Sequence, residues 1–165
     1  MFFVRSMEKS ICPICHQSLK VIGSRRRSAT DENGDAMVLV LRRLRCTDSG
    51  CGKIHHELPD LLTPYKRQTT TILEQIITGH HEAVPVENST IRRVRAWFHA
   101  RANVLVGALL STYATVTQDY GVDFSDLPQS ILDRIFFFVG EPEGWLKKVV
   151  RILVNNHRWP HTQLA

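Results

Sequence analysis

The four cysteines of the chain form two close pairs, Cys12-Pro-Ile-Cys15 and Cys46-Thr-Asp-Ser-Gly-Cys51. Each pair offers two sulfur ligands from one short loop. The thirty residues between the pairs are enough for a hairpin that brings the second loop back to the first. The spacing predicts one tetrahedral Zn²⁺ site with Cys12, Cys15, Cys46 and Cys51 as ligands. Two disulfides, unliganded thiols, or His16 in place of one cysteine are the alternatives.

The residues between the pairs have the pattern of that hairpin. Residues 19–27 and 36–45 are typical of strands, and Asn33-Gly34 between them is typical of a two-residue type I′ turn. With such a turn, residues whose numbers sum to 67 face each other. Val21 then lies opposite Cys46, and Arg25 lies opposite Arg42. Residues 53–56 predict a third strand, so we expect a zinc ribbon over residues 7–66.

Arginines are concentrated on the two predicted strands. They are Arg25, Arg26, Arg27, Arg42, Arg43 and Arg45. Like charges across a strand pair destabilise it, so this cluster is either simply solvated or built to contact phosphates. Residues 1–68 carry twelve Lys and Arg against seven Asp and Glu, whereas residues 69–165 carry nine of each. This surplus favours an anionic partner, and we expect the six arginines to contact a nucleic-acid backbone.

Beyond residue 67 the pattern is helical. An apolar stripe and Gly79 predict a helix over residues 69–78 with a glycine cap. A second helix is expected to begin at Asn88 or Ser89. Its apolar positions, at spacings of three and four, are Ile91, Val94, Phe98, Ala102 and Leu105. Further helices are predicted over residues 104–118, 127–139 and 145–156.

The first turns of the second helix carry groups that can bind DNA. Ser89, Thr90, Arg92 and Arg93 offer donors to base edges and phosphates, at the position from which recognition helices enter the major groove. Residues 67–103 therefore predict a helix–turn–helix-like unit, and residues 104–165 a C-terminal helical section continuous with it. An ordinary amphipathic helix with a solvated basic face is the alternative. Phe136-Phe-Phe138 and the apolar positions of the last helix predict a helical core, or else a surface for a protein partner or a homodimer.

His55-His56-Glu57 is the remaining group with potential chemistry. Adjacent side chains on a strand point to opposite faces, so the two histidines cannot easily bind one metal ion. We expect a structural role for one imidazole near the ribbon. A metal-dependent nuclease that uses His55, His56 and Glu57 is the alternative. The chain has no nucleophile-elbow or phosphate-loop pattern, and we expect no small-molecule substrate.

The composition is that of a folded protein, with 43% hydrophobic and 22% charged residues. No segment reaches the eighteen or so apolar residues of a membrane span. The first five residues lack the apolar core and cleavage pattern of a signal peptide. We therefore expect a cytoplasmic protein without a membrane partner, in which reduced thiols favour metal over disulfides. Residues 1–6 have no structural role in this interpretation, so the true start is either Met1 or Met7.

Several motifs resemble an uncharacterised family of zinc-ribbon proteins from Gram-positive bacteria. They are Arg42-Arg-Leu-Arg-Cys46, residues 54–67 (IHHELPDLLTPYKR), Ser89-Thr-Ile-Arg-Arg93, Trp97-Phe98 and residues 145–155 (WLKKVVRILVN). Members of that family are often found beside mobile elements and prophages. The arrangement is also similar to the amino-terminal ends of insertion-element transposases, where a zinc ribbon precedes a helix–turn–helix. Two features depart from these patterns: four residues rather than two separate the second pair of cysteines, and no room is left after residue 101 for a ribonuclease-H-like catalytic domain.

The resemblance implies DNA binding without catalysis. We therefore expect an α+β protein in which a four-cysteine zinc ribbon precedes an all-α helix–turn–helix and C-terminal helices. Its expected function is non-enzymatic, zinc-dependent DNA binding, linked to a mobile element or phage, with RNA as the alternative ligand. The competing hypothesis is an adaptor that docks a transposase, polymerase or phage component through its C-terminal helices.

Overall fold

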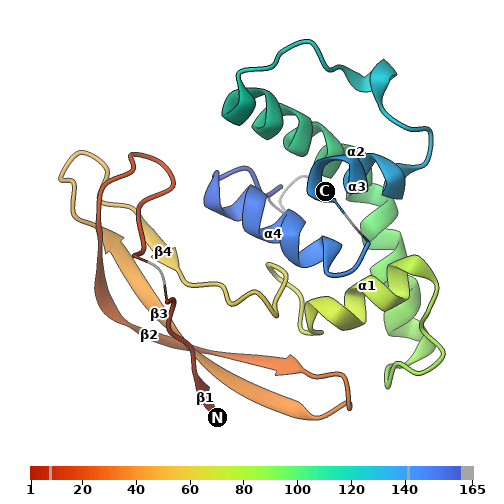
Figure 1. Ribbon diagram of the computed structural model, residues 1–165. Helices are drawn as coiled ribbons and strands as arrows, with labels where there is room; N and C mark the ends of the chain where they lie inside the picture. Colours follow the sequence, from red (N-terminus) through yellow and green to blue (C-terminus); the bar gives the residue numbers. More distant parts are fainter. Residues whose placement is uncertain (8, 141, 161–165) are drawn as a thin grey trace.

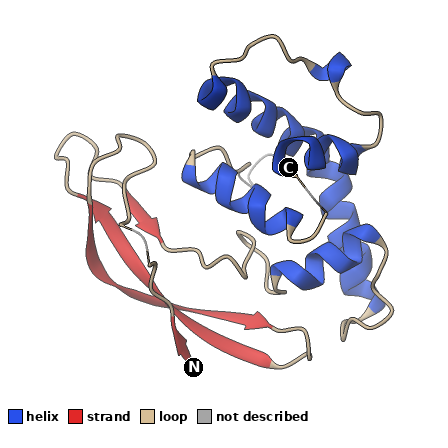
Figure 2. Ribbon diagram, in the orientation of Figure 1, coloured by secondary structure: helices blue, strands red, loops and turns tan. Residues whose placement is uncertain are grey.

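A small β-sheet and a group of helices lie side by side in the computed structural model, which describes residues 1–7, 9–140 and 142–160 (Figure 1). Among these residues the chain forms four strands first and four α-helices afterwards, joined by residues 57–69 (Figure 2). The predicted mixed α+β class is therefore confirmed. No helix within the described ranges combines the length and the apolar content that a membrane span requires.

Strand β3 (Ala36–Cys46) is the centre of the sheet. β2 (Leu19–Thr30) pairs with one side of it in antiparallel fashion, while β1 (Phe2–Phe3) and β4 (Ile54–His56) pair with the other side. The expected third strand is thus present as β4. Residues 2–4 also join the sheet, since β1 runs parallel to β3 and the Val4 N–H donates to the carbonyl of Val40. The expectation that residues 1–6 have no structural role was wrong.

The turn of the β2–β3 hairpin differs from the predicted one. Thr30 pairs with Ala36, so the loop has five residues rather than two. The carboxylate of Asp31 accepts the N–H groups of Asn33 and Asp35 at 3.0 and 2.9 Å. In this loop Gly34 alone takes a positive φ, 86°, whereas a type I′ turn needs two such residues. The Asp31 side chain therefore selects a wider loop in which the glycine occupies one left-handed position.

A β-bulge shifts the register again near the cysteines. The pairing is irregular between Val21 and Gly23, and beyond it Leu19, not Val21, lies opposite Cys46. Arg25 faces Leu41 rather than Arg42. The predicted register was therefore wrong by one residue near the turn and by two near the metal-binding end. Because side chains alternate along a strand, the one-residue error places Arg42 on the other face of the sheet from Arg25.

The helices follow the predicted apolar stripes closely. α1 (Thr70–Thr78) ends at Gly79, whose φ is 89°. α2 (Asn88–Thr117) is one continuous helix that begins after Glu87 and includes both predicted helical segments. A 3₁₀ turn, η1 (Phe124–Asp126), precedes α3 (Ile131–Val139) and α4 (Trp145–Asn155). α3 begins four residues later than predicted, because Ser130 caps it by accepting the Asp133 N–H.

The helices share one large hydrophobic core. The predicted stripe of α2 is buried in it, and α4 adds fully buried residues such as Leu146 and Leu153. Trp145 packs edge-to-face on Phe98 and Phe136, with ring centroids 5.8 and 6.1 Å apart. The helical-core prediction for Trp145 is thus confirmed. The sheet has only a small core of its own, whose buried members are Ala29, Leu39, Leu41 and Leu62.

Candidate metal centre and adjoining basic face

The four cysteine sulfurs converge at the end of the sheet opposite the hairpin turn. The loops that precede β2 and follow β3 lie at this end, at upper left in Figure 1. Their Sγ atoms all lie within 4.8 Å of one another, with Cys12 to Cys51 at 3.8 Å and Cys15 to Cys46 at 3.3 Å. A disulfide would need about 2.05 Å between sulfurs. Four sulfurs bound at about 2.3 Å to one tetrahedral ion lie about 3.8 Å apart. These distances exclude two disulfides in this structure and fit a metal ion with four thiolate ligands.

Each cysteine loop closes with a left-handed residue directly after its second cysteine. In the first loop His16 has a φ of 60°, and its N–H donates to the carbonyl of Cys12 at 2.9 Å. In the second loop Gly52 has a φ of 53°, and its N–H donates to the carbonyl of Asp48 at 2.9 Å. The Asp48 carboxylate also accepts the Cys51 N–H at 2.8 Å. The longer second loop therefore contains its own hydrogen-bond acceptor, the Asp48 carboxylate, which positions Cys51 at the site.

The environment of the sulfurs indicates that a cation completes the site. Burial opposes ionisation of Cys12, but the N–H groups of Cys15 and Ile14 outweigh it and lower the pKa of that thiol to about 6. Burial raises the pKa of the Cys46 thiol to about 12, and the neighbouring sulfurs add to the effect. Four thiolates cannot be crowded together in a buried position without a compensating positive charge. A bound metal ion would supply that charge.

Two histidines lie near the cysteines but are not part of the ligand group. Within the described ranges, Cys12, Cys15, Cys46 and Cys51 form the one group of side chains that could hold a metal ion, and His16 is not in it. His55 lies opposite Leu44 in the sheet, and its Nε2 is 3.4 Å from the Cys12 Sγ. The expected structural role of one imidazole beside the site agrees with this contact.

Cationic side chains gather on the face of the sheet that points away from the cysteines. Lys20 lies opposite Arg45, and Gly23 lies opposite Arg43, with Arg25 two residues further along β2. Opposed residues share a face, and alternate residues along a strand share a face. Lys20, Arg25, Arg43 and Arg45 therefore project together, and we call these four residues the basic face. Cys46 follows Arg45 directly and so belongs to the other face.

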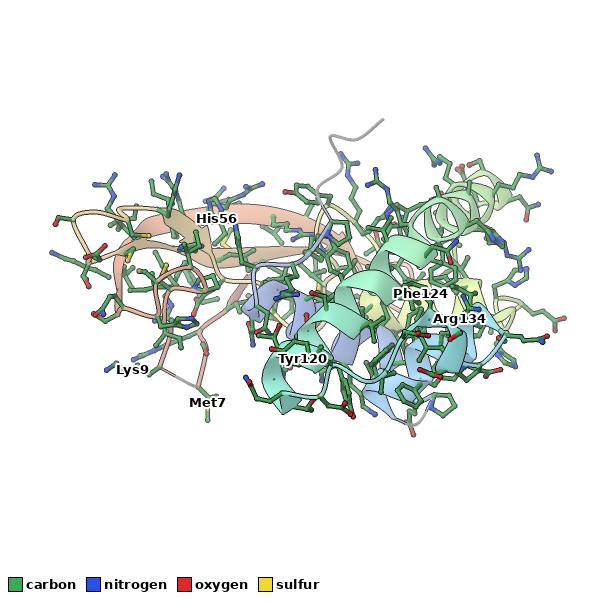
Figure 3. The ribbon with its side chains drawn as sticks, turned by 90° about the horizontal axis from the view of Figure 1, so that it is seen from above. Met7, Lys9, His56, Tyr120, Phe124 and Arg134 are labelled. Atoms are coloured by element: carbon green, nitrogen blue, oxygen red, sulfur yellow. The ribbon has the colours of Figure 1, made fainter. Side chains whose placement is uncertain are left out.

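His56 adjoins the basic face. It pairs with Arg43 across β4 and β3, and its pKa is lowered by burial and then by the charges of Arg25 and Arg43. Figure 3 shows His56 on the side of the sheet from which several nitrogen-tipped side chains project. Among the described residues, the cations that form ion pairs are Arg42, Lys147 and Arg151, so no carboxylate pairs with the basic face.

The other three hairpin arginines have different surroundings. Arg27 is half-buried and donates to the carbonyls of Thr63 and Lys66 at 2.7 and 2.8 Å. Arg42 forms a two-pronged ion pair with Glu57, in which its Nε lies 2.6 Å from the carboxylate. Arg26 is exposed on the opposite face from Arg25, across from Val40. Arg27 and Arg42 therefore bind groups of the protein itself.

A family model over half of the chain confirms a domain of unknown function. The model described as "Domain of unknown function (DUF6431)" matches residues 12–94. The chain belongs to the DUF6431 family. The matched range contains all four cysteines, the six hairpin arginines and residues 54–67, whereas residues 145–155 lie beyond it. No curated protein and no solved structure matches this DUF6431 chain.

The three side chains of His55-His56-Glu57 take three directions in this DUF6431 chain. His55 points to Cys12, His56 lies beside the basic face, and Glu57 binds Arg42. Alternation along β4 accounts for the separation of the two histidines. The arrangement does not bring the three groups to a common point.

The candidate residues of α2 lie at its exposed amino-terminal end. Ser89 donates to the Glu87 carboxylate at 3.1 Å, and Arg93 donates to the Thr90 hydroxyl at 3.1 Å. The side chains of Ser89, Arg92 and Arg93 are exposed, whereas Thr90 is half-buried. These residues are accessible, and the hydrogen bonds among them are local to the first two turns.

Two residues of the basic region, Lys20 and Lys66, were not predicted from the sequence. Lys20 belongs to the basic face through its pairing with Arg45. Lys66 places its Nζ 4.2 Å from the centroid of the Trp97 ring. The strand position of Lys20 was a usable signal, because a residue at the start of β2 must oppose the end of β3. The contact between Lys66 and Trp97 depends on how the sheet and helices pack, which no local pattern encodes.

Proposed function

We propose that this DUF6431 chain is a non-enzymatic, zinc-dependent DNA-binding protein whose basic face contacts the phosphate backbone. The observation that carries the proposal is the grouping of Lys20, Arg25, Arg43 and Arg45 on one face. Like charges this close repel one another, and no carboxylate within the described residues offsets them. A polyanion would relieve this repulsion and release its own counterions on binding.

Zinc has a structural role in this proposal. Four thiolates in a tetrahedral arrangement are the usual ligands of a closed structural zinc site, with no position left for a substrate. Cys15 precedes β2 and Cys46 ends β3, so a bound ion fixes these strands at the end where Lys20 and Arg45 lie opposite each other. Together with β4, the hairpin and its cysteine loops would form a zinc ribbon. The dispersal of His55, His56 and Glu57 supports binding rather than hydrolysis.

The helix–turn–helix-like part of the proposal concerns α1 and α2. Exposed Ser89, Arg92 and Arg93 would approach a DNA groove with Thr90 beside them. The connection between the helices, residues 79–87, is longer than the three or four residues of a tight helix–turn–helix. The orientation of α2 would therefore be set by its packing in the helical core. The link to a mobile element or phage depends on the sequence resemblance.

A salt titration of DNA binding tests the proposal. Binding to a mixed-sequence duplex should weaken linearly in a plot of log affinity against log salt, with a slope of about −0.9 per phosphate contacted. The double variant Arg43→Ala/Arg45→Ala should reduce the slope by about 2. Arg25→Ala should reduce it by about 1, while its neighbour Arg26→Ala, on the opposite face, serves as the matched control. Binding that ignores salt, or equal losses for Arg25→Ala and Arg26→Ala, would contradict the proposal. The same titration with RNA separates the two nucleic acids.

A second candidate function, a protein-interaction adaptor, is favoured by exposed apolar side chains near the end of α2 and on α3. Val116 and Tyr120 are 69% and 72% exposed, and Phe137 is 50% exposed with its ring 6.5 Å from that of Tyr113. Such a surface is typical of protein contacts, including a homodimer. An adaptor should give no retardation of duplex DNA at physiological salt. Sedimentation of Phe137→Ser beside the unchanged chain would show whether this surface joins two copies.

A further inference from the structure

We propose that the basic face continues across residues 63–66 onto α2, so that one DNA duplex contacts the sheet and the helix together. This surface, the basic track, consists of Lys20, Arg25, Arg43, Arg45, Lys66, Arg93 and Arg101. The inference rests on the proposed DNA binding and adds a defined path to it. The hairpin arginines and the α2 arginines, which are far apart in the sequence, become parts of one footprint.

Arg27 is not itself part of the track, but it connects the basic face of the sheet to residues 63–66. It alternates with Arg25 along β2 and so projects from the same face of the sheet. Its guanidinium donates to the carbonyls of Thr63 and Lys66 at 2.7 and 2.8 Å. Burial lowers the pKa of Arg27, and the charge of Arg25 lowers it further, which shows that the two cations are close. The loop that contains Lys66 is therefore held directly beside the basic face.

Lys66 forms the second link, from the loop to α2. Its ammonium lies over the indole of Trp97, 4.2 Å from the ring centroid, within the range of a cation–π contact. Burial lowers the pKa of Lys66, and the charge of Arg101 lowers it further. Arg101 lines one hollow together with Pro64 and Trp97, so Lys66, which lies over the Trp97 ring, is near Arg101 as well. Its charge lies between the cations of the sheet and those of the helix.

The third part of the track is one face of α2. Arg93, Trp97 and Arg101 are separated by four residues each, so they follow one another along the same side of the helix. Arg92 lies about 100° around the axis from Arg93. Of the two arginines that the sequence analysis placed in a DNA groove, Arg93 shares the side of Trp97, and Arg92 does not.

The dimensions of the track suit a duplex of about one turn. Seven residues of β3, from Leu39 opposite Arg27 to Arg45, span about 20 Å. Nine residues of α2, from Arg93 to Arg101, span about 12 Å. One turn of DNA is about 34 Å long, whereas five base pairs at about 3.4 Å each are shorter than the sheet row alone. Only the longer duplex can reach both rows.

The test compares residues on and off the track, and it uses two duplex lengths. Anisotropy titrations over a range of salt would use a 16-base-pair duplex and a five-base-pair duplex closed by a hairpin loop. On the long duplex, Arg93→Ala and Lys66→Gln should each reduce the salt slope by about 1, and Lys148→Gln, at an exposed position of α4 outside the track, should leave it unchanged. On the short duplex, the effects of Arg93→Ala and Lys66→Gln should be absent, while that of Arg43→Ala/Arg45→Ala remains. Circular dichroism and thermal melting of each variant verify its fold.

The outcomes separate this inference from the proposed function. If Arg93→Ala or Lys66→Gln behaves like Lys148→Gln, while Arg43→Ala/Arg45→Ala still weakens binding, the basic track is wrong and DNA binding by the sheet stands. If none of these variants changes the slope, both are wrong. If the full pattern appears with an RNA duplex and not with DNA, the assigned ligand class is overturned.

Discussion

The sheet and the helical part of the chain are stabilised in different ways. The helices bury a continuous apolar core that includes Ile135, Trp145 and Leu146, whereas the sheet buries only four residues in its own cluster. A unit with so small a core cannot offset its conformational entropy by hydrophobic burial alone. Metal binding by the four cysteines can supply the missing free energy. The proposed DNA-binding face is thus on the part of the molecule that has the smaller core and the candidate metal centre.

The two parts are nevertheless joined by specific contacts. Leu58 packs against both hydrophobic clusters, and Asp60 in the connecting segment forms ion pairs with Arg151 and Lys147 of α4. The Asp60 pairs are exposed, so each contributes at most about 1 kcal/mol. These exposed ion pairs therefore couple the two parts only weakly. Partial unfolding is the expected response to loss of the metal.

Removal of the metal should have the largest effect on the difference in stability between the sheet and the helices. Chelation, or Cys12→Ser/Cys46→Ser, should unfold the sheet, because structural zinc contributes about 10–16 kcal/mol in small zinc-binding peptides. The helical signal in circular dichroism should remain while the amide resonances of β2 and β3 collapse. Restoring Zn²⁺ to the chelated protein is the control and should recover them. A single transition in which both signals vanish together would show that the two parts are not independent.

A cavity in the helical core is the complementary perturbation. Leu146 is fully buried, so Leu146→Ala should lower the free energy of unfolding by about 2–5 kcal/mol. The metal affinity of the cysteines should be unchanged, as measured by competition with a chromogenic chelator. Val104→Ala, at an exposed position of α2, is the control and should have little effect. A parallel loss of metal affinity in Leu146→Ala would contradict the separation of the two cores.

The same contrast explains what could be predicted from the sequence. The stripe of Ile91, Val94 and Phe98 predicted their burial correctly, because helical periodicity is a local property of the chain. The hairpin register failed, because it depends on the Asp31 side chain in the turn and on a bulge near Gly23. Neither is encoded by the Asn33-Gly34 pair that predicted the turn.

The candidate site also has features that follow from local spacing and features that depend on strand register and packing. The convergence of the cysteines was predictable, since loop spacing and one hairpin are sufficient to define it. The basic face was predictable only in part, because a one-residue change of register moves a side chain to the other face. Arg25 and Arg43 share the basic face, whereas Arg42 lies on the other side and binds Glu57. The position of Lys66 over Trp97 required the packing of the sheet against the helices.

Loss of the ion pair between Arg42 and Glu57 would be a smaller perturbation, confined to the sheet. The hydrogen bond from Arg42 holds the pKa of Glu57 below its usual range, and Glu57 is only 7% exposed. The pair therefore stabilises the fold above the ordinary pKa of glutamate, and the stabilisation is lost as the pH falls through the lowered folded-state value. Glu57→Gln should lower the free energy of unfolding by about 2 kcal/mol at pH 7.

Urea titrations at pH 7 and at pH 3 measure this difference. Acid also releases metal from thiolates, so the informative quantity is the difference between Glu57→Gln and the unchanged chain at each pH. That difference should shrink in acid, and the exposed Glu82→Gln should show no such trend. A difference that is the same at both pH values would exclude ionisation of Glu57 as its source.

The smallest expected effect compares the two cysteine loops with each other. His16 and Gly52 occupy equivalent left-handed positions, with φ values of 60° and 53°. A side chain costs about 1 kcal/mol in this conformation, whereas glycine costs some entropy in the unfolded chain. His16→Gly should therefore stabilise the metal-bound sheet by about 0.5 kcal/mol, and Gly52→Ala should destabilise it by about 1 kcal/mol. His16→Ala distinguishes strain from loss of the imidazole, because it removes the ring and keeps the Cβ atom. If His16→Ala and His16→Gly gave the same change in chelator competition, backbone strain would not be its cause.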